Sequence, residues 1–205
     1  MVQDISLLDA IYTTRAIRKF KDEPVPMELI AKVLEAATQA PSGVNSQPWR
    51  FLVLDDPQKK EALAEMYRTS YYGRRVGWDL DETTSSSVYL ANRLGEAPLH
   101  ILVCGPSFKN NMSADSLTMS VPAAVYPATQ NLLLAARAYG LGGVLTINHE
   151  PFNPQVRQLL GIPDRFYVYA VIPMGFAAER HGKKTRKPVS EVTFYNNWGE
   201  PLGEA

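Results

Sequence analysis

Three short apolar runs constrain the fold of this chain more than any other feature. They are WRFLVL at residues 49–54, LHILVC at residues 99–104 and FYVYAVI at residues 166–172. Each is mostly apolar and too short for a typical helix, which predicts strands buried within a sheet. A shorter strand is predicted at residues 144–147, and helices are predicted near residues 6–12, 26–40, 57–69, 122–139 and 153–160. Strands separated by helices indicate helical layers around one sheet.

The composition fits one domain spanning residues 1–205, with 45% hydrophobic residues. The 21 basic and 21 acidic residues cancel, which argues against nucleic acid and anionic membranes as partners. No apolar run approaches the roughly 18 residues of a membrane span. The N-terminus lacks a basic region followed by an apolar one. We therefore expect a cytoplasmic protein.

The residues that usually carry chemistry are sparse. Cys104 is the only cysteine and lies in an apolar run, so we expect an inert buried thiol. The three histidines lack ligand-like spacing, and we expect no metal site. The glycines of residues 140–143 follow a helix rather than a strand, unlike a dinucleotide fingerprint. With no nucleophile motif either, we predict no catalytic side chain and assign the chemistry to a bound organic cofactor.

Two basic segments are candidate phosphate-binding elements. TTRAIRK at residues 13–19 carries Arg15 and Arg18, whose guanidinium forks suit phosphate if they converge. HGKKTRKP at residues 181–188 is the densest positive run of the chain. For each segment taken alone, the alternative is a solvated basic stretch, which for the second extends to nonspecific polyanion binding.

An uncharged polar loop joins the second predicted helix to the first predicted strand. APSGVNSQPW at residues 40–49 places hydrogen-bonding side chains and a glycine between two prolines. Such side chains suit the edge of a neutral heteroaromatic ring. The alternative is an ordinary connecting loop with capping side chains.

These blocks together resemble the FMN-dependent nitroreductase family. The similarity spans roughly residues 8–190 and is carried by TTRAIRKF, APSGVNSQPWRF, QNLLLAARAYGLGG, LLGIP and TRKP. The resemblance implies an α+β fold, a three-layer α/β/α sandwich around one mixed, largely antiparallel sheet. It also implies an obligate homodimer with two FMN sites at the interface, and a C-terminal tail, residues 177–205, that wraps the partner.

The resemblance also implies which residues contact FMN. They are Arg15, Ala16, Arg18, Pro41, Ser42, Gly43, Asn45, Gln47, Leu145, Thr146, Ile147, Lys184 and Arg186. By this resemblance, Arg15 lies near the phosphate and Arg18 toward the pyrimidine edge of the flavin. Lys184 and Arg186 correspond to a C-terminal clamp on the phosphate. The loop at residues 41–47 reaches FMN bound chiefly by the other subunit. Family members often have Arg-Arg-Ser at residues 14–16, where this chain has Thr-Arg-Ala.

The implied activity is that of an NAD(P)H oxidoreductase. NADH or NADPH reduces the flavin, leaves, and a nitroarene or quinone then takes its place in a ping-pong cycle. A backbone amide or the Thr146 hydroxyl is expected to hydrogen-bond the flavin nitrogen. Residues 70–96 lack a sustained pattern and are expected to form a variable excursion that covers the substrate. Four aromatic residues lie in or just before it: Tyr67, Tyr71, Tyr72 and Trp78. They are either an aromatic lid over the substrate or ordinary core and surface aromatics.

Three alternatives stay open. The same cofactor site serves reductive dehalogenases and flavin-fragmenting enzymes of this superfamily. A flavin-binding protein without turnover would be a store or sensor, and steady NAD(P)H consumption would exclude it. A nucleic-acid binder using residues 183–187 is disfavoured by the zero net charge.

Overall fold

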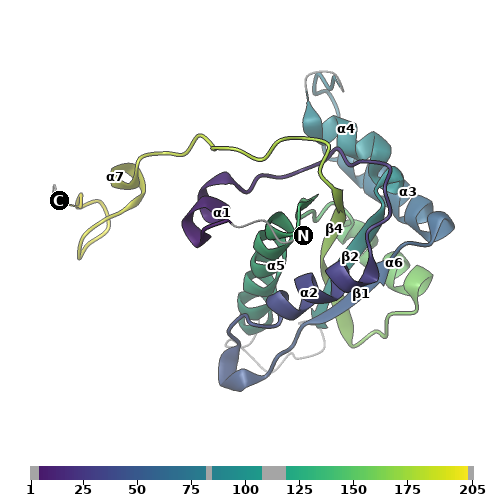
Figure 1. The fold of residues 1–205 in the computed structure, drawn as a ribbon, viewed down its shortest axis with the longest axis horizontal. Helices are drawn as coiled ribbons and strands as arrows, with labels where there is room; N and C mark the ends of the chain where they lie inside the picture. The colour runs from purple at the N-terminus through teal and green to yellow at the C-terminus, as the bar shows by residue number, and fades with distance from the viewer. Residues whose placement is uncertain (1–4, 82–84, 108–118, 203–205) are drawn as a thin grey trace.

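The computed structural model describes residues 5–81, 85–107 and 119–202. Figure 1 shows helices packed around one sheet, with a tail that leaves the body. The elements are α1 (Leu7–Thr13), α2 (Met27–Ala37), η1 (Gly43–Asn45), β1 (Arg50–Leu54), α3 (Pro57–Gly73), α4 (Ser86–Arg93), η2 (Leu94–Glu96), β2 (Leu99–Pro106), α5 (Ser120–Ala138), β3 (Leu141–Gly143), η4 (Glu150–Phe152), α6 (Asn153–Leu160), β4 (Phe166–Phe176) and α7 (Val189–Val192).

The sheet has the strand order β1-β2-β4-β3. Phe51 pairs with Val103 and Ile101 with Ile172, and every pairing among the described residues is antiparallel. The expectation of one largely antiparallel sheet is confirmed. The parallel pair that a mixed sheet needs is not among these pairings.

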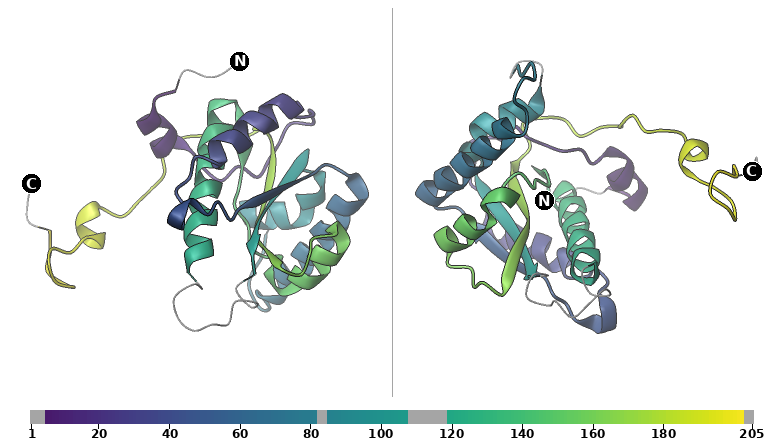
Figure 2. Two further views of the ribbon diagram at one scale, coloured as in Figure 1. Left: turned by 90° about the horizontal axis from the view of Figure 1, so that it is seen from below. Right: turned by 180° about the vertical axis from the view of Figure 1, so that it is seen from behind.

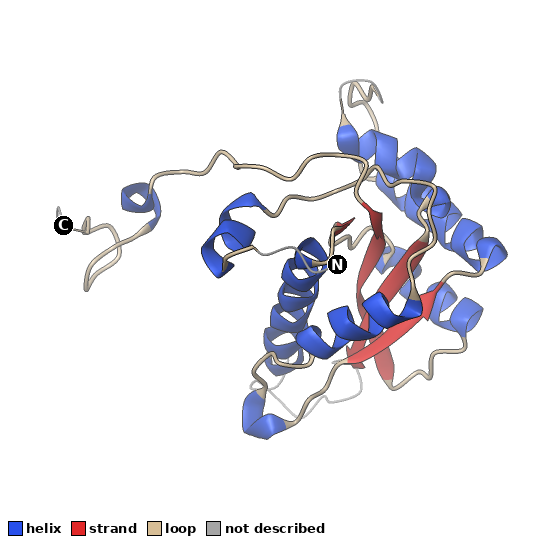
Figure 3. Cartoon of the chain, viewed as in Figure 1, coloured by secondary structure: helices blue, strands red, loops and turns tan. Residues whose placement is uncertain are grey.

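Helices cover both faces of the sheet, as the cartoon in Figure 3 shows. Ile101 and Val103 of β2 face a core shared with α2 and α5, whereas Leu102 and Cys104 face a core shared with α3 and α6. Successive side chains of a strand point to opposite faces, so a continuous apolar run serves both cores. The three-layer α+β architecture is therefore confirmed.

The predicted short strand at residues 144–147 was placed too late. The strand is β3, which pairs Leu141 with Phe176 and Gly143 with Met174. Its glycines permit a close approach, because a Cβ on Gly142 would lie 2.7 Å from the Ile17 side chain. A glycine run that resembles a simple helix stop is thus a strand against which a neighbouring segment packs.

Residues 70–96 are more regular than their sequence indicates. The segment contains the end of α3 and all of α4, so helices form where the sequence shows no sustained pattern, and the role of the segment as a variable cover over the substrate stays a prediction. Helix α4 buries Val88, Leu90 and Ala91 in a small core with Tyr67 and Tyr71. Residues 82–84 lie outside the described part of the chain.

The C-terminal segment extends away from the body, as Figures 1 and 2 show from three sides. Its short helix α7 buries no residue. Large apolar side chains along the tail are exposed, with Trp198 at 92%. The expectation that residues 177–205 wrap a partner subunit stays a prediction.

Candidate functional site

Two segments from opposite ends of the chain lie side by side. The backbone hydrogen bonds that join them are Lys21 N to Phe176 O (2.9 Å), Ala178 N to Lys19 O (3.0 Å) and Gly182 N to Thr13 O (2.9 Å). A further bond, from Ile17 N to Gly143 O at 3.1 Å, ties the first segment to β3. The two basic segments identified in the sequence are thereby brought together.

A cavity of about 380 Å³, here called the basic cavity, lies where these segments meet. Its lining residues are Thr14, Arg15, Ala16, Arg18, Gln130, Leu133, Gly143, Val144, Leu145, Lys184 and Arg186. Four of these side chains are cationic and none is acidic. Clustered guanidinium and ammonium groups favour a phosphate or another multiply charged anion.

Lys184 holds the tail against the end of α1. Its Nζ atom donates to the carbonyl oxygens of Ile11 at 3.0 Å and Thr14 at 2.7 Å. Carbonyls at a helix C-terminus lack partners within the helix, so a cation there is favourable. Lys184 therefore fixes the shape of the basic cavity as well as contributing charge to it.

A second cavity of about 380 Å³, here called the aromatic cavity, continues from the first. Its lining residues are Arg18, Tyr67, Tyr71, Arg74, Arg75, Ser87, Leu90, Val144, Leu145, Thr146, Ile147 and Asn148. Arg18, Val144 and Leu145 line both cavities. The two therefore adjoin, and together they are here called the groove. The basic cavity contributes four cations, and the aromatic cavity contributes two tyrosine rings together with Arg74 and Arg75.

The tyrosines of the aromatic cavity are core residues rather than a mobile cover. Tyr67 is 3% exposed and Tyr71 2% exposed, and the Tyr71 hydroxyl bonds to Ser87 Oγ at 2.8 Å. Burial raises the pKa of Tyr67, so its hydroxyl is protonated at neutral pH. The core interpretation of these two residues is confirmed, whereas Trp78 is 67% exposed.

Residues 145–147 line the aromatic cavity, and the exposure of their side chains alternates along the segment. The Thr146 N–H and hydroxyl both donate to Val171 O, at 3.0 and 2.8 Å. Leu145 and Ile147 remain 37% and 47% exposed. The hydroxyl hydrogen of Thr146 is thus engaged by the sheet in this structure, and which of the two expected donors, a backbone amide or this hydroxyl, contacts a cofactor nitrogen stays a prediction.

The polar loop at residues 41–47 lies elsewhere. None of its residues lines either cavity, and in Figure 1 the loop is below α2 while the two basic segments cross the top. Val44, Asn45 and Gln47 have positive φ values of 47°, 55° and 44°, and Ser42 Oγ accepts from Gln47 N at 3.0 Å. A valine with this backbone conformation is strained, so the loop is held in a defined shape.

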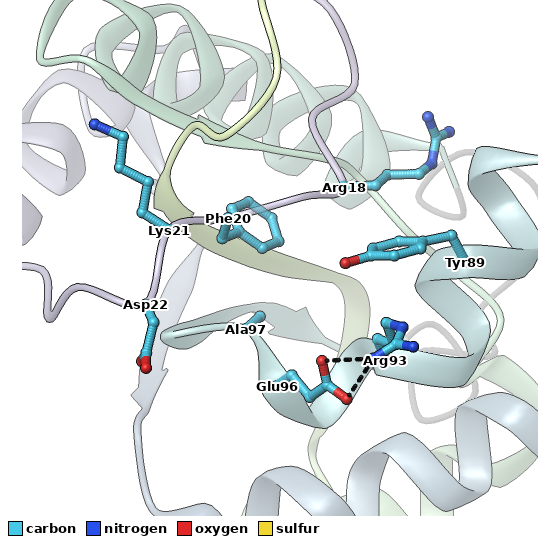
Figure 4. Close-up of a pocket in the computed structure, with 8 residues that line it drawn as sticks. All are labelled: Arg18, Phe20, Lys21, Asp22, Tyr89, Arg93, Glu96 and Ala97. Carbon is cyan, nitrogen blue, oxygen red and sulfur yellow. Dashed lines mark hydrogen bonds and ion pairs between the residues drawn. The ribbon is translucent and has the colours of Figure 1, made fainter. Parts of the chain in front are cut away.

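A third cavity of about 340 Å³ lies on another side of Arg18. Figure 4 shows the Arg18 and Tyr89 side chains next to each other, with Lys21 and Asp22 directed away from them. Arg93 in its wall pairs with Glu96 at 3.2 Å. Arg18 is therefore shared by all three cavities, and its Nη1 donates to Ser86 Oγ at 3.3 Å.

One chain brings together most of the predicted cofactor residues. Arg15, Ala16, Arg18, Leu145, Thr146, Ile147, Lys184 and Arg186 line the groove. Pro41, Ser42, Gly43, Asn45 and Gln47 do not. The groove of a single chain is accordingly built from one part of the predicted set only.

Comparison with known proteins identifies the family. A sequence model described as "Nitroreductase family" matches residues 11–176. The chain belongs to the nitroreductase family.

Relatives agree with this assignment across nearly the whole chain. A protein of Methanothermobacter thermautotrophicus with the provisional name NADH dehydrogenase/NAD(P)H nitroreductase is 34% identical, covering 89% of this chain and 83% of its own. An iodotyrosine deiodinase of Thermotoga neapolitana is 30% identical, covering 94% and 98%. The crystal structure of an oxidized iodotyrosine deiodinase bound to FMN and 3-iodo-L-tyrosine superposes with a TM-score of 0.76 at 28% identity, covering 94% and 100%. The chain is thus a nitroreductase-family oxidoreductase.

Some groove residues of this family member were not predicted from its sequence. They are Thr14, Gln130, Leu133, Gly143, Val144, Arg74, Arg75, Ser87, Leu90 and Asn148. Gln130 gives the clearest missed signal, because it is a polar residue in an Ala/Leu-rich helix. The α4 residues gave none, since their segment lacks a long pattern.

The buried thiol and imidazole groups lie outside the groove. Burial raises the pKa of Cys104 to about 12 and lowers that of His100 to about 3. The His100 Nε2–H donates to Leu94 O at 3.1 Å, and the pKa lowered by burial leaves the ring neutral at physiological pH. The expectation that the Cys104 thiol is buried is confirmed. No helix in the described part of the chain is long and apolar enough to cross a bilayer.

Proposed function

We propose that the groove binds FMN, with the phosphate in the basic cavity and the flavin ring along residues 145–147. The observation that carries this proposal is the convergence of Arg15, Arg18, Lys184 and Arg186 in one cavity that continues into an aromatic one. Cationic forks suit the phosphate dianion, while exposed Leu145 and Ile147 offer apolar contact to a ring. The FMN-bound structural neighbour supports the choice of cofactor.

We propose that the protein is an FMN-dependent NAD(P)H oxidoreductase that acts on nitroarenes, quinones or similar acceptors. Held by Arg15, Arg18, Lys184 and Arg186, FMN would supply two-electron redox chemistry in a ping-pong cycle, with NAD(P)H as hydride donor and an acceptor that gains two electrons and two protons. The provisional NAD(P)H nitroreductase name of the archaeal relative supports this reading.

The chain's own groups then have positioning and electrostatic roles. The guanidinium of Arg18, placed where the two cavities join, would stabilise negative charge on the pyrimidine edge of the ring. The Leu145 N–H has no backbone acceptor in the described part of the chain. It replaces the Thr146 hydroxyl as the donor we assign to a ring nitrogen, because the hydroxyl already donates to Val171 O.

We further propose that the working unit is a homodimer, in which the loop at residues 41–47 of one subunit completes the groove of the other. The loop is shaped by positive φ values yet exposed, and it lies away from its own groove. Helix α1 exposes Leu7, Leu8 and Tyr12 by 60% or more. An exposed apolar helix face and an apolar tail are the surfaces that a partner subunit would cover.

The first experiment is the visible spectrum of the purified protein, with the released chromophore identified by chromatography. Oxidised flavin bands, identified as FMN and bleached anaerobically by NADH or NADPH, are expected. Steady NAD(P)H consumption with a quinone then separates an enzyme from a flavin store. A colourless protein that does not bind added FMN would overturn the proposal.

A second candidate is reductive dehalogenation, favoured by the relatives named iodotyrosine deiodinase. In that reaction two electrons and a proton replace the carbon–iodine bond by carbon–hydrogen and release iodide. Anaerobic incubation of the reduced protein with 3-iodo-L-tyrosine, followed by iodide measurement, distinguishes the two candidates.

A further inference from the structure

Arg75 stacks on an aromatic ring in the wall of the aromatic cavity. Its guanidinium carbon lies 3.9 Å from the centroid of the Tyr71 ring and 5.8 Å from that of Trp78. One guanidinium nitrogen donates to Tyr71 O at 2.9 Å. Stacking on a ring and one hydrogen bond restrict the fork to one orientation, with further N–H groups remaining for another acceptor.

The charges around this cavity are unbalanced. Arg18, Arg74 and Arg75 line it, and no carboxylate does so in the described part of the chain. Arg74 is paired with Glu150 at 3.0 Å. Arg75 has no ion pair among the residues that the structure describes. A half-buried guanidinium without a counterion favours an anionic ligand.

The cofactor does not account for this charge. The phosphate has its own cations in the basic cavity, and Arg18 is the arginine shared with that cavity. Arg75 lines only the aromatic cavity, on its α3 side. It therefore faces the part of the groove that is left for the acceptor.

We propose that the acceptor site selects planar, electron-poor molecules that carry a carboxylate or similarly placed anionic group, and that Arg75 binds this group. The inference rests on the proposed function, since it concerns the substrate of that same site. A guanidinium held against an aromatic ring can donate two parallel hydrogen bonds to a carboxylate. In this position it also lies beside the flat ring of the substrate.

The competing explanation is that Arg75 only caps α3. The residue follows the end of this helix, and its bond to Tyr71 O is the kind of contact that satisfies a terminal carbonyl. A cap affects stability and all acceptors alike. An anion-binding residue changes the preference between a charged and an uncharged acceptor, so the two roles are separable.

The test compares 4-nitrobenzoate with 4-nitrobenzamide as acceptors of the FMN-loaded protein. The ratio of their kcat/KM values is measured for the natural protein and for Arg75→Gln and Arg75→Lys. Intrinsic reactivity differences cancel when ratios are compared between variants. Loss of a charge-assisted bond predicts that Arg75→Gln lowers the ratio about tenfold, mainly through weaker binding of the carboxylate-bearing acceptor. Arg75→Lys retains the charge without the fork and is expected to fall between.

Arg68→Gln is the matched control. Arg68 lies in α3, the helix that Arg75 follows, and pairs with Glu61 at 3.3 Å, but it lines neither cavity. This variant is expected to leave the ratio unchanged. An unchanged ratio in Arg75→Gln, with a lowered melting temperature and normal reduction of a neutral quinone, would reject the anionic acceptor and leave the proposed function standing. Absence of bound FMN and of quinone reduction in the natural protein would reject both.

Discussion

The Nζ atom of Lys184 lies 2.7 Å from the carbonyl oxygen of Thr14, although 170 positions separate the two residues in the chain. This contact closes the basic cavity, because it fixes the tail beside the segment that carries Arg15 and Arg18. The site thus depends on a long-range contact that adds charge and geometry together.

Replacing Lys184 by methionine is expected to weaken FMN binding about tenfold, since a cation and two charge-assisted hydrogen bonds are lost. Titration of the apoprotein by quenching of flavin fluorescence measures the change. Lys183→Met is the control, because Lys183 is an exposed neighbour that lines neither cavity. Equal effects of both variants would show that only the overall charge of the tail matters.

Gly142→Ala is expected to destabilise the fold by about 1–3 kcal/mol, because the added Cβ would lie 2.7 Å from the Ile17 side chain. Displacing the segment around Ile17 also moves Arg15 and Arg18, so FMN affinity falls with stability. Urea unfolding and FMN titration measure the two effects. At Gly182 a Cβ meets nothing within 4 Å, and Gly182→Ala should behave as the natural protein does.

Mixed dimers test whether the groove and the loop come from different subunits. Arg186→Ala damages the basic cavity, and Ser42→Ala with Asn45→Gly damages the loop. Each altered homodimer is expected to lose most FMN-dependent activity. A heterodimer of the two has one undamaged groove if the loop acts across the interface, so activity approaches half of the natural value.

Pairing Arg186→Ala with Lys184→Met is the control for that experiment, since both changes affect the same cavity and no undamaged groove results. If the first heterodimer also stays inactive while dimers form normally, the loop serves its own subunit or has no part in the site.

His100 makes stability depend on pH in the acidic range. Burial holds its pKa at about 3 in the folded protein, against 6.5 for the ordinary side chain. Below pH 6.5 the unfolded chain binds a proton that the folded protein does not, so stability falls by about 1.4 kcal/mol per pH unit until the folded pKa is reached. The loss from this residue between pH 6.5 and pH 5 is about 2 kcal/mol.

His100→Gln, which keeps a donor for Leu94 O, is expected to remove this contribution. Urea unfolding of both proteins at pH 7 and pH 5 is the measurement. Parallel losses of stability in the two proteins would mean that His100 titrates normally in the folded state.

Local sequence patterns determine much of this structure. The apolar runs at β1, β2 and β4 specify strands because their side chains must be buried on both faces of the sheet. The apolar stripe of α2 likewise specifies a helix. The family assignment also follows from the sequence, since the blocks that carry it are contiguous.

Tertiary structure decided what local patterns could not. β3 is too short and glycine-rich to have strand propensity, and it is a strand because β4 supplies its partner and Ile17 needs space beside Gly142. The sequence does not show whether the Thr146 hydroxyl bonds to a cofactor or within the protein. In the structure this hydroxyl donates to Val171 O. The role proposed for Arg75 depends on its stacking against the Tyr71 ring. It also depends on the absence of a carboxylate among the described residues that line the aromatic cavity. Side-chain partners distant in sequence set these properties, and residue type alone carries no information about them.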